Sequence, residues 1–298
     1  MEQTKKIKFF CLPGGGTSSI VFIKWGGLLS KHLRQCLIDI PGRGLRKKEQ
    51  TLTDIESITE DLYRGWEKYM NDGRDEDYML FGYCMGGIFL YELYKKIRRE
   101  GKKLPVHIVL SAADVPDGDV YAEPFLENQA TKYQFYDLLR SCFPEHTFPD
   151  TEMLTAFRHK FVDVLYAKYA RDGRFTPVTV YELCTANYDD AMMESFEFRE
   201  CLGLANDLME ILTVDTQICS DYQRSKPEAV KFNCGITCIA GKDDLLLKPE
   251  RMRAWQRYTD KACTLDILEA DHRFLMTANP VPCGVINRDA DKIWETMQ

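Results

Sequence analysis

An apolar strand pattern that runs directly into a glycine-rich turn is the feature that most limits how this chain can fold. Residues 77–81 (DYMLF) have the composition of a strand, and residues 86–100 carry the apolar spacing of an amphipathic helix. The stretch between them, GYCMGG, places Cys84 at the centre of a Gly-x-Cys-x-Gly turn. Glycines are needed in such a turn because the strand and helix backbones nearly touch. The sequence therefore predicts a sharp strand-to-helix turn with Cys84 at its apex.

The same alternation of strand and helix patterns continues along the chain. Further strands are predicted at 6–11, 34–40, 105–111, 235–240 and 264–268. Further helices are predicted at 19–32, 53–70, 250–261 and 287–297, the second opening with Thr53 and Glu56 in capping-box spacing. This order predicts an α/β fold with a mostly parallel sheet covered by helices on both faces. A chain of 298 residues with 45% hydrophobic residues can form this as one domain spanning 1–298.

The alternation stops between about 115 and 230, where apolar residues recur at helical spacing, as in Met153, Phe157 and Phe161. We interpret this segment as an enlarged helical insertion within the single domain. It can form a lid over the carboxyl ends of the strands, where open α/β sheets bind ligands. The alternative is a set of extra core helices remote from any site.

Charge, apolar runs and cysteines exclude several classes of protein. The net charge of −7 is spread along the chain without a basic stripe, which argues against nucleic acid as a partner. No apolar segment approaches the roughly 20 residues that span a bilayer, so we expect no membrane insertion and a soluble, cytoplasmic protein. The 11 cysteines are an odd number without a framework, which predicts reduced thiols. Cys234 and Cys238 have no further ligand at metal-binding spacing, so no zinc site is expected.

Cys84 is the candidate nucleophile. A Gly-x-Ser-x-Gly turn between a strand and a helix holds a nucleophilic serine in a strained conformation, and here cysteine takes the serine position. The helix that follows points its amino end at the thiol, which favours a thiolate. The same geometry directs the Met85 amide toward a developing oxyanion. The alternative is that Cys84 is one more buried thiol.

The partners of such a nucleophile follow in the order acid, then histidine. Of five histidines, His272 alone follows the predicted final strand and precedes a helix. The acid is expected from CIAGKDDLLLKPE, which offers Asp243 and Asp244. Asp114, just after an earlier strand, is a competing acid. In this arrangement His272 takes the proton of Cys84, and the aspartate holds the imidazole in the useful tautomer.

The glycine-rich stretch CLPGGGTSS after the first strand has two interpretations. It can supply the second oxyanion amide, from Gly15 or Gly14. Alternatively, its glycines together with Asp39 at the end of the next strand faintly resemble a dinucleotide fingerprint, although the final glycine is missing. The dinucleotide interpretation leaves Cys84 and His272 without a role, so we favour the oxyanion loop.

From its first strand to its last helix, the chain resembles the stand-alone type II thioesterases, α/β-hydrolases that accompany nonribosomal peptide and polyketide synthases. CLPGGGTSSIVFIKW is similar to the family's Pro-His-Ala-Gly-Gly segment and its following tryptophan, here Trp25. IDIPGRGLR is similar to the Pro-Gly-Arg-x-x-Arg stretch, with Arg43 and Arg46 in place. LFGYCMGG is similar to the Phe-Gly-His-Ser-Met-Gly elbow. GKDDLLLKPERMRAW is similar to the Gly-x-x-Asp segment, with Asp244 on the catalytic aspartate and Trp255 on a characteristic tryptophan.

The resemblance implies a thioesterase that releases acyl groups from the phosphopantetheine arm of an acyl- or peptidyl-carrier protein, with Asp244 completing a triad with Cys84 and His272. It implies no metal and no organic cofactor, because the nucleophile and the base are side chains. The chain departs from the family in three ways: cysteine replaces serine, Gly14 stands where histidine is usual, and the insertion is longer. Within the insertion, ILTVDTQICSDY keeps the aspartate of the family's Leu-Arg-Ala-Asp stretch, here Asp215, but lacks the arginine.

The cysteine leaves other functions open. Transfer of an acyl group from pantetheine to Cys84 exchanges one thioester for another, so an amine or thiol could compete with water and the enzyme could be an acyltransferase or a cyclising enzyme. A third possibility, from another class, is a non-catalytic carrier-protein partner. For docking of an acidic carrier protein, RGLRKK at residues 43–48 is a candidate basic patch, and the plain alternative is a solvated loop.

Overall fold

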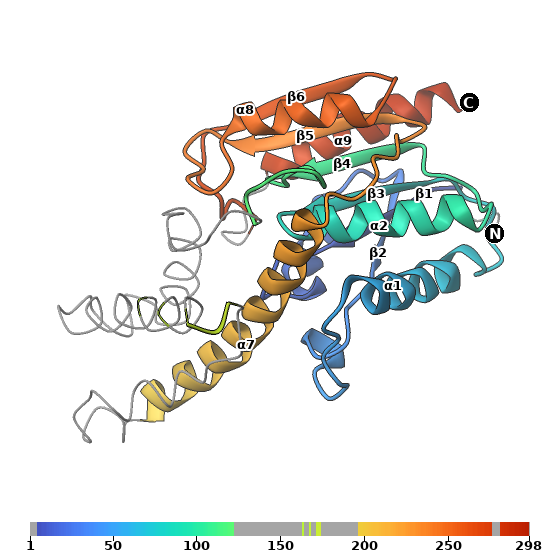
Figure 1. The fold of residues 1–298 in the computed structure, drawn as a ribbon. Helices are drawn as coiled ribbons and strands as arrows, with labels where there is room; N and C mark the ends of the chain where they lie inside the picture. The colour runs from blue at the N-terminus through green and yellow to red at the C-terminus, as the bar shows by residue number, and fades with distance from the viewer. Residues whose placement is uncertain are drawn as a thin grey trace.

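The computed structural model describes residues 5–121, 163, 167, 171–173, 196–275 and 281–297. Six strands form one parallel sheet in the order β2-β1-β3-β4-β5-β6 (Figure 1). The strands are β1 (Ile7–Leu12), β2 (Leu33–Leu37), β3 (Tyr78–Tyr83), β4 (His107–Ser111), β5 (Gly235–Gly241) and β6 (Cys263–Leu268). Each lies within three residues of the predicted range, so the predicted α/β fold with a parallel sheet is confirmed.

Helices cover both faces of the sheet, as predicted (Figure 1). On one face lie α1 (Ile55–Met70), α2 (Gly86–Arg99), α8 (Pro249–Met252) and the short helix η3 (Arg253–Tyr258). On the other face lie η1 (Ser19–Gly27) and α9 (Val281–Thr296). Asn287 of α9 donates to the carbonyl of Leu28, 2.9 Å away, which joins α9 to the end of η1. A short turn, η2 (Gly44–Arg46), follows β2.

Alternate residues of the strands fill the two layers of the core. In β1, Phe9 packs against Phe81, whose ring contacts Trp25 of η1. The next residue, Phe10, points to the opposite face and packs against Tyr69 of α1. Because both faces are covered, the inner strands are mostly apolar on both faces rather than alternating, which is why short apolar runs identified them.

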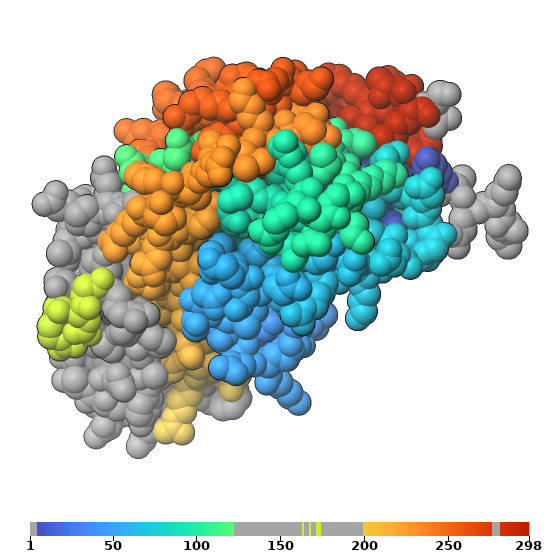
Figure 2. Space-filling view, turned by 45° about the vertical axis from the view of Figure 1, so that its right-hand side comes forward, coloured from blue at the N-terminus to red at the C-terminus, as the bar shows by residue number. Residues whose placement is uncertain are grey.

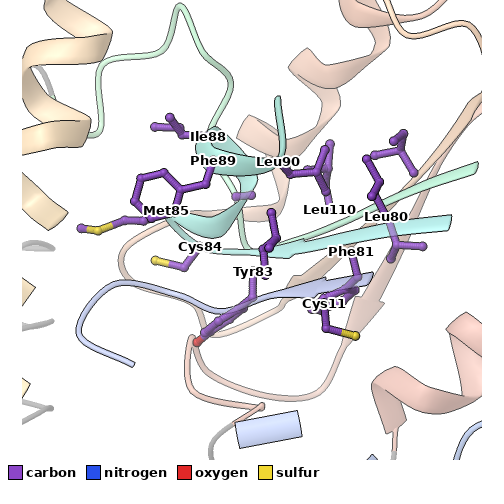
Figure 3. Packing of buried hydrophobic residues seen from close by; sticks show 14 of the residues in the cluster. Cys11, Leu80, Phe81, Tyr83, Cys84, Met85, Ile88, Phe89, Leu90 and Leu110 are labelled. Carbon is purple, nitrogen blue, oxygen red and sulfur yellow. The ribbon is translucent and has the colours of Figure 1, made fainter. Parts of the chain in front are cut away.

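The turn between β3 and α2 is as tight as the glycine pattern predicted (Figure 3). Cys84 adopts φ 54°, in the left-handed region that a side chain rarely occupies. A Cβ added at Gly86 would lie 2.4 Å from the carbonyl oxygen of Pro13 and 2.6 Å from that of Leu12. A Cβ at Gly82 would lie 2.7 Å from the carbonyl oxygen of Gly86. All three contacts are with backbone, so neither glycine can be replaced without moving a strand.

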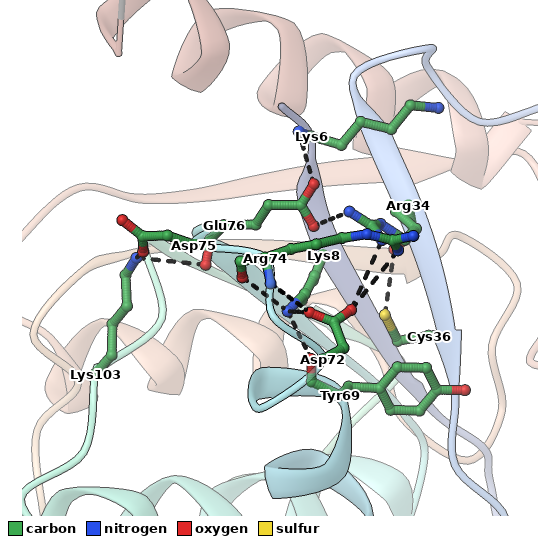
Figure 4. Close-up of polar contacts among 10 residues, drawn as sticks. All are labelled: Lys6, Lys8, Arg34, Cys36, Tyr69, Asp72, Arg74, Asp75, Glu76 and Lys103. Atoms are coloured by element: carbon green, nitrogen blue, oxygen red, sulfur yellow. Dashed lines mark hydrogen bonds and ion pairs between the residues drawn. The ribbon is translucent and has the colours of Figure 1, made fainter. Parts of the chain in front are cut away.

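At the opposite end of the sheet, a buried lysine ties α1 to β1 (Figure 4). Lys8 is fully buried in β1, and its ammonium donates to the carbonyl oxygen of Tyr69 at 2.6 Å and to Asp72 at 2.9 Å. Arg34 of β2 forms an ion pair with Glu76, which also accepts the backbone N–H of Lys6. This network satisfies a charge that would otherwise be costly to bury. Sequence analysis did not predict it.

The long helix α7 (Phe196–Arg224) is the main described part of the segment between β4 and β5. Its last turns lie at the carboxyl ends of the strands, and its first turns extend away from the sheet (Figure 1). In the space-filling view α7 forms a continuous band beside α1 (Figure 2). The predicted lid insertion at 115–230 therefore stays a prediction, because most of residues 122–195 lie outside the described part, including Met153, Phe157 and Phe161.

Three details differ from the sequence predictions. The N-cap of α1 is Asp54, whose carboxylate accepts the N–H of Ser57 at 2.7 Å, so the capping box predicted at Thr53 and Glu56 is wrong by one residue. An aspartate at this position also favours the positive end of the helix dipole. The helix predicted at 19–32 is the shorter 3-10 segment η1, and α9 begins at Val281 rather than near 287. No described helix is long and apolar enough to cross a membrane.

We predict that Gly86→Ala destabilises the fold by about 1–3 kcal/mol, because the added methyl group meets backbone carbonyls that cannot rotate away. Gly284→Ala in α9 is the matched control, since no described atom lies within 4 Å of the added carbon. That change should be neutral or stabilise by up to about 1 kcal/mol through helix propensity. Urea unfolding followed by circular dichroism measures both. Equal stability of the two variants would contradict the steric argument.

Candidate active site

Residues from four loops meet at the carboxyl edge of the sheet. The loop after β1 carries Gly14 and Gly15, and Cys84 follows β3. Asp244 follows β5, and His272 follows β6. Cys84 lies beside the end of β1, where the strand order reverses direction between β1 and β3. Such a switch point is where open α/β sheets form their ligand sites.

Asp244 and His272 are joined by a direct hydrogen bond. His272 Nδ1 lies 2.7 Å from Asp244 Oδ2, and both side chains are buried. The second carboxylate oxygen accepts the backbone N–H groups of Leu246 at 2.8 Å and Leu247 at 2.7 Å. These bonds fix the carboxylate, and its position fixes the tautomer in which His272 presents Nε2 to the thiol. The hydroxyl of Tyr83 donates to the carbonyl of His272 at 2.5 Å, which holds the histidine loop against the elbow.

The two competing acids have other surroundings. Asp243 is exposed, and its backbone N–H donates to the carbonyl of Ala270. The carboxylate of Asp114 is buried and accepts from Gln223 at 3.0 Å and from the N–H of Val120 at 3.2 Å. Of the three predicted acids, Asp244 is therefore the one that the fold brings onto His272.

Cys84 and His272 stabilise each other's charged forms. Burial raises the pKa of the Cys84 thiol, but the charge and hydrogen bond of His272 outweigh it and hold that pKa below the ordinary value of 9.0. Burial likewise lowers the pKa of His272, and the charges of Cys84 and Asp244 raise it well above its ordinary value. The two side chains therefore favour each other's charged forms, and the thiolate is the nucleophilic form of a cysteine.

The predicted oxyanion loop lies against the elbow. A hydrogen bond from the Met85 amide helps to lower the pKa of Cys84. A Cβ added at Gly14 would lie 3.2 Å from the Cβ of Cys84 and 2.9 Å from the ring of Tyr83. At Gly15 it would lie 2.3 Å from the sulfur of Met85. The absence of histidine at position 14 thus has a physical reason, because the Tyr83 ring fills that space.

A buried ion pair fixes this loop to α7. Arg43 donates two hydrogen bonds to Asp215, at 2.6 and 2.7 Å, and the two side chains are 1% and 0% exposed. The same carboxylate accepts the N–H of Gly16 at 3.0 Å. Asp215, which sequence analysis noted without a role, therefore holds the glycine loop to the Pro-Gly-Arg turn.

The dinucleotide interpretation does not fit these contacts. The carboxylate of Asp39 accepts the backbone N–H of Ser19 at 2.7 Å and that of Leu45 at 3.2 Å, so it serves to join two loops. The helix after the glycines is the 3-10 segment η1, whose first residue is Ser19. Within the described residues, no group of three or more histidine, cysteine or acidic side chains could hold a metal ion.

Tyr121 is a residue of the site that no sequence pattern predicted. Its hydroxyl lies 3.4 Å from the Cys84 sulfur, and the ring is buried. The available signal was its place shortly after β4, since the carboxyl ends of parallel strands share one edge. The stretch ADVPDGDVY carries no motif that would have distinguished this tyrosine from the other 14.

Comparison with known proteins gives a consistent result. The family model for the thioesterase domain matches residues 8–288. The gramicidin S biosynthesis protein GrsT of Aneurinibacillus migulanus is 24% identical over 275 residues, covering 92% of this chain and 85% of that protein. The medium-chain S-acyl fatty acid synthase thioesterase of Homo sapiens is 19% identical over 269 residues, covering 90% of this chain and 81% of that protein.

Solved structures share the fold. ClbQ from the colibactin pathway superposes with a TM-score of 0.65 at 20% identity, covering 99% of this chain and 100% of that chain. RedJ of Streptomyces coelicolor, a thioesterase of prodiginine biosynthesis, superposes with a TM-score of 0.63 at 20% identity, covering 96% and 86%. Together with the family match over nearly the whole chain, the parallel sheet and its elbow place this chain in the thioesterase domain family, with an α/β-hydrolase fold.

Proposed function

We propose that this thioesterase hydrolyses acyl groups from the phosphopantetheine arm of an acyl- or peptidyl-carrier protein, through a Cys84-His272-Asp244 triad and an acyl-cysteine intermediate. The observation that carries the proposal is the 2.7 Å bond from His272 to Asp244, beside a thiol whose pKa His272 lowers. Relatives named for gramicidin S biosynthesis and for fatty acid synthase support a carrier-bound thioester as the substrate.

In the first step, the Cys84 thiolate attacks the thioester carbonyl carbon, and the carbonyl π electrons move to oxygen. The Met85 amide, and one from Gly15 or Gly14, would stabilise that oxyanion. Collapse of the intermediate breaks the bond to the pantetheine sulfur, which leaves with the proton of His272. The product is acyl-Cys84 with a neutral imidazole.

In the second step, His272 takes a proton from water as the water oxygen attacks the acyl carbon. Collapse now breaks the bond to Cys84, which leaves as a thiolate, and the carboxylic acid is released. The proton remains on His272, so the resting thiolate and imidazolium are restored. Asp244 stabilises the imidazolium in both steps without taking its proton.

The predicted docking patch at residues 43–48 is smaller than its sequence suggests. Arg43 is buried against Asp215, and Arg46 pairs with Glu49 and Asp61. Lys47 and Lys48 remain exposed, next to Leu45 with 84% of its surface exposed. We propose that an acidic carrier protein would meet two lysines and one apolar side chain here, rather than four cations.

The decisive experiment is intact-protein mass spectrometry of an acyl-loaded carrier protein, incubated with the wild-type enzyme and with Cys84→Ala. We expect the acyl mass to disappear and free acid to form with the wild type alone. An acyl adduct on the enzyme that only an added amine discharges would instead identify an acyltransferase. No change with either protein would identify a non-catalytic carrier-protein partner.

The identity of the acid has its own test. Asp244→Asn should lower turnover by roughly 10²–10⁴-fold, because the amide cannot stabilise the imidazolium. Asp243→Asn is the matched control and should retain turnover, since its side chain is exposed. A loss of turnover in Asp114→Asn greater than that in Asp244→Asn, with both variants folded, would show that Asp244 is not the acid.

Alkylation tests the thiolate without any substrate. Because the pKa of Cys84 is lowered, its reaction with iodoacetamide should persist as the pH falls below the ordinary thiol range. Burial raises the pKa of Cys11 and Cys219, and the hydrogen bond with Cys263 together with burial raises that of Cys238, so these thiols should react slowly at neutral pH. Peptide mapping should find the label on Cys84 and also on the half-buried Cys263, whose pKa is lowered by its hydrogen bond with Cys238. His272→Asn should suppress the label on Cys84 alone. Uniform labelling of all thiols would exclude an activated Cys84.

A further inference from the structure

The Cys84 sulfur has a second side-chain partner besides His272. The hydroxyl of Tyr121 lies 3.4 Å from it, and both side chains are at most 2% exposed. The distance is within the range for hydrogen bonds to sulfur. The mechanism proposed for the triad does not involve this phenol. The phenol nevertheless contacts the sulfur atom that would form and break the bond to the acyl group.

The direction of this hydrogen bond follows from the charges. Burial and the charge of Cys84 raise the pKa of Tyr121 well above its ordinary value, so the phenol keeps its proton. The thiolate has no proton to give, and it can only accept. Tyr121 therefore donates to the sulfur, and this bond is one of the causes that lower the pKa of Cys84.

A separate framework holds the phenol in place. The backbone N–H of Tyr121 donates to Gln223 Oε1 at 2.8 Å, and Gln223 belongs to α7. The amide nitrogen of Gln223 donates to Asp114 at 3.0 Å and to the carbonyl of Val115 at 3.0 Å. Gln223 is fully buried, and Asp114 nearly so. Asp114, the competing candidate for the triad acid, thus supports the loop that carries Tyr121.

We propose that Tyr121 is a catalytic residue, whose phenol donates a hydrogen bond to the Cys84 sulfur and stabilises it as a thiolate, both as the resting nucleophile and as the leaving group of the acyl-cysteine. This inference rests on the proposed role of Cys84 as the nucleophile. No proton moves from Tyr121 in either step.

The larger effect should fall on release of the acyl group. A hydrogen bond to sulfur lowers the nucleophilicity of the thiolate, which partly offsets the gain in thiolate population. A thiolate of lower pKa is also a better leaving group. Collapse of the second tetrahedral intermediate is therefore accelerated, with no opposing loss of nucleophilicity. Tyr121 therefore favours hydrolysis of the acyl-cysteine. In this step the leaving atom is the Cys84 sulfur, where a serine enzyme would have an oxygen.

Other groups near the sulfur set the background for a pH measurement. His272 faces it from the loop after β6, the Met85 amide from the start of α2, and Cys219 from α7. Cys219 stays a neutral thiol, because burial and the charge of Asp215 raise its pKa. Asp114 acts on Tyr121 itself and also favours the protonated phenol.

The test is the pH dependence of Cys84 alkylation in Tyr121→Phe, which removes the hydroxyl and keeps the ring. We expect the apparent pKa of the alkylation rate to rise by about one unit, as for loss of a hydrogen bond to a charged group, with an unchanged rate at high pH. The matched control is Tyr258→Phe, which removes a buried hydroxyl bonded to Asp117 at 2.7 Å and should leave the apparent pKa unchanged. In turnover with an acyl-loaded carrier protein, Tyr121→Phe should accumulate an acyl adduct on Cys84, visible by intact mass.

An unchanged apparent pKa in a folded Tyr121→Phe protein would overturn the assignment. If that variant does not fold, 3-fluorotyrosine at position 121 retains the ring and is a stronger donor, so the apparent pKa should fall, and no shift would again overturn it. Alkylation uses no thioester, which separates the two proposals. A shift in an enzyme that hydrolyses no thioester would refute the proposed function and leave the role of Tyr121 toward the sulfur intact.

Discussion

The close contact between the start of α2 and the end of β1 is the constraint on which the site depends. The carbonyl oxygens of Leu12 and Pro13 leave no space for a side chain at Gly86, so the helix begins directly against the neighbouring strand. This contact forces Cys84 into φ 54° and lifts its thiol above the carboxyl edge of the sheet. Strain of this kind persists only where the surroundings fix it, and here two glycines and two strands do so.

A second constraint joins the glycine loop to α7. Burying the Arg43-Asp215 pair removes two charges from water, a cost that the bidentate bond and the Gly16 N–H offset. Such a pair adds little to stability compared with apolar packing, but its geometry is specific. It sets where the loop beside Cys84 lies. Gln223, further along α7, fixes the position of Tyr121 in a similar way, by accepting its backbone N–H.

A cysteine in this elbow changes what the surroundings must do. A serine needs a base at the moment of attack, whereas the lowered pKa of Cys84 favours the charged form of the thiol before any attack. Hydrogen bonds from His272, Tyr121 and the Met85 amide all lower the pKa of Cys84. The apolar surroundings make each of these interactions stronger than it would be in water. These partners of Cys84 therefore all favour the charged form of its thiol.

Local patterns in the sequence determined the strands and the elbow, because each depends on residues close together in the chain. The family resemblance favoured Asp244 over Asp243 and Asp114, but only the tertiary structure shows that Asp244 contacts His272 while Asp114 contacts Gln223, because these contacts join segments far apart in the chain. The tertiary structure also decided the buried partner of Asp215 and the place of Tyr121. The one-residue shift of the α1 cap shows the limit of local signals, since neighbouring Thr53 and Asp54 are both good caps. Contacts between distant segments depend on how the sheet is assembled, which no local pattern encodes.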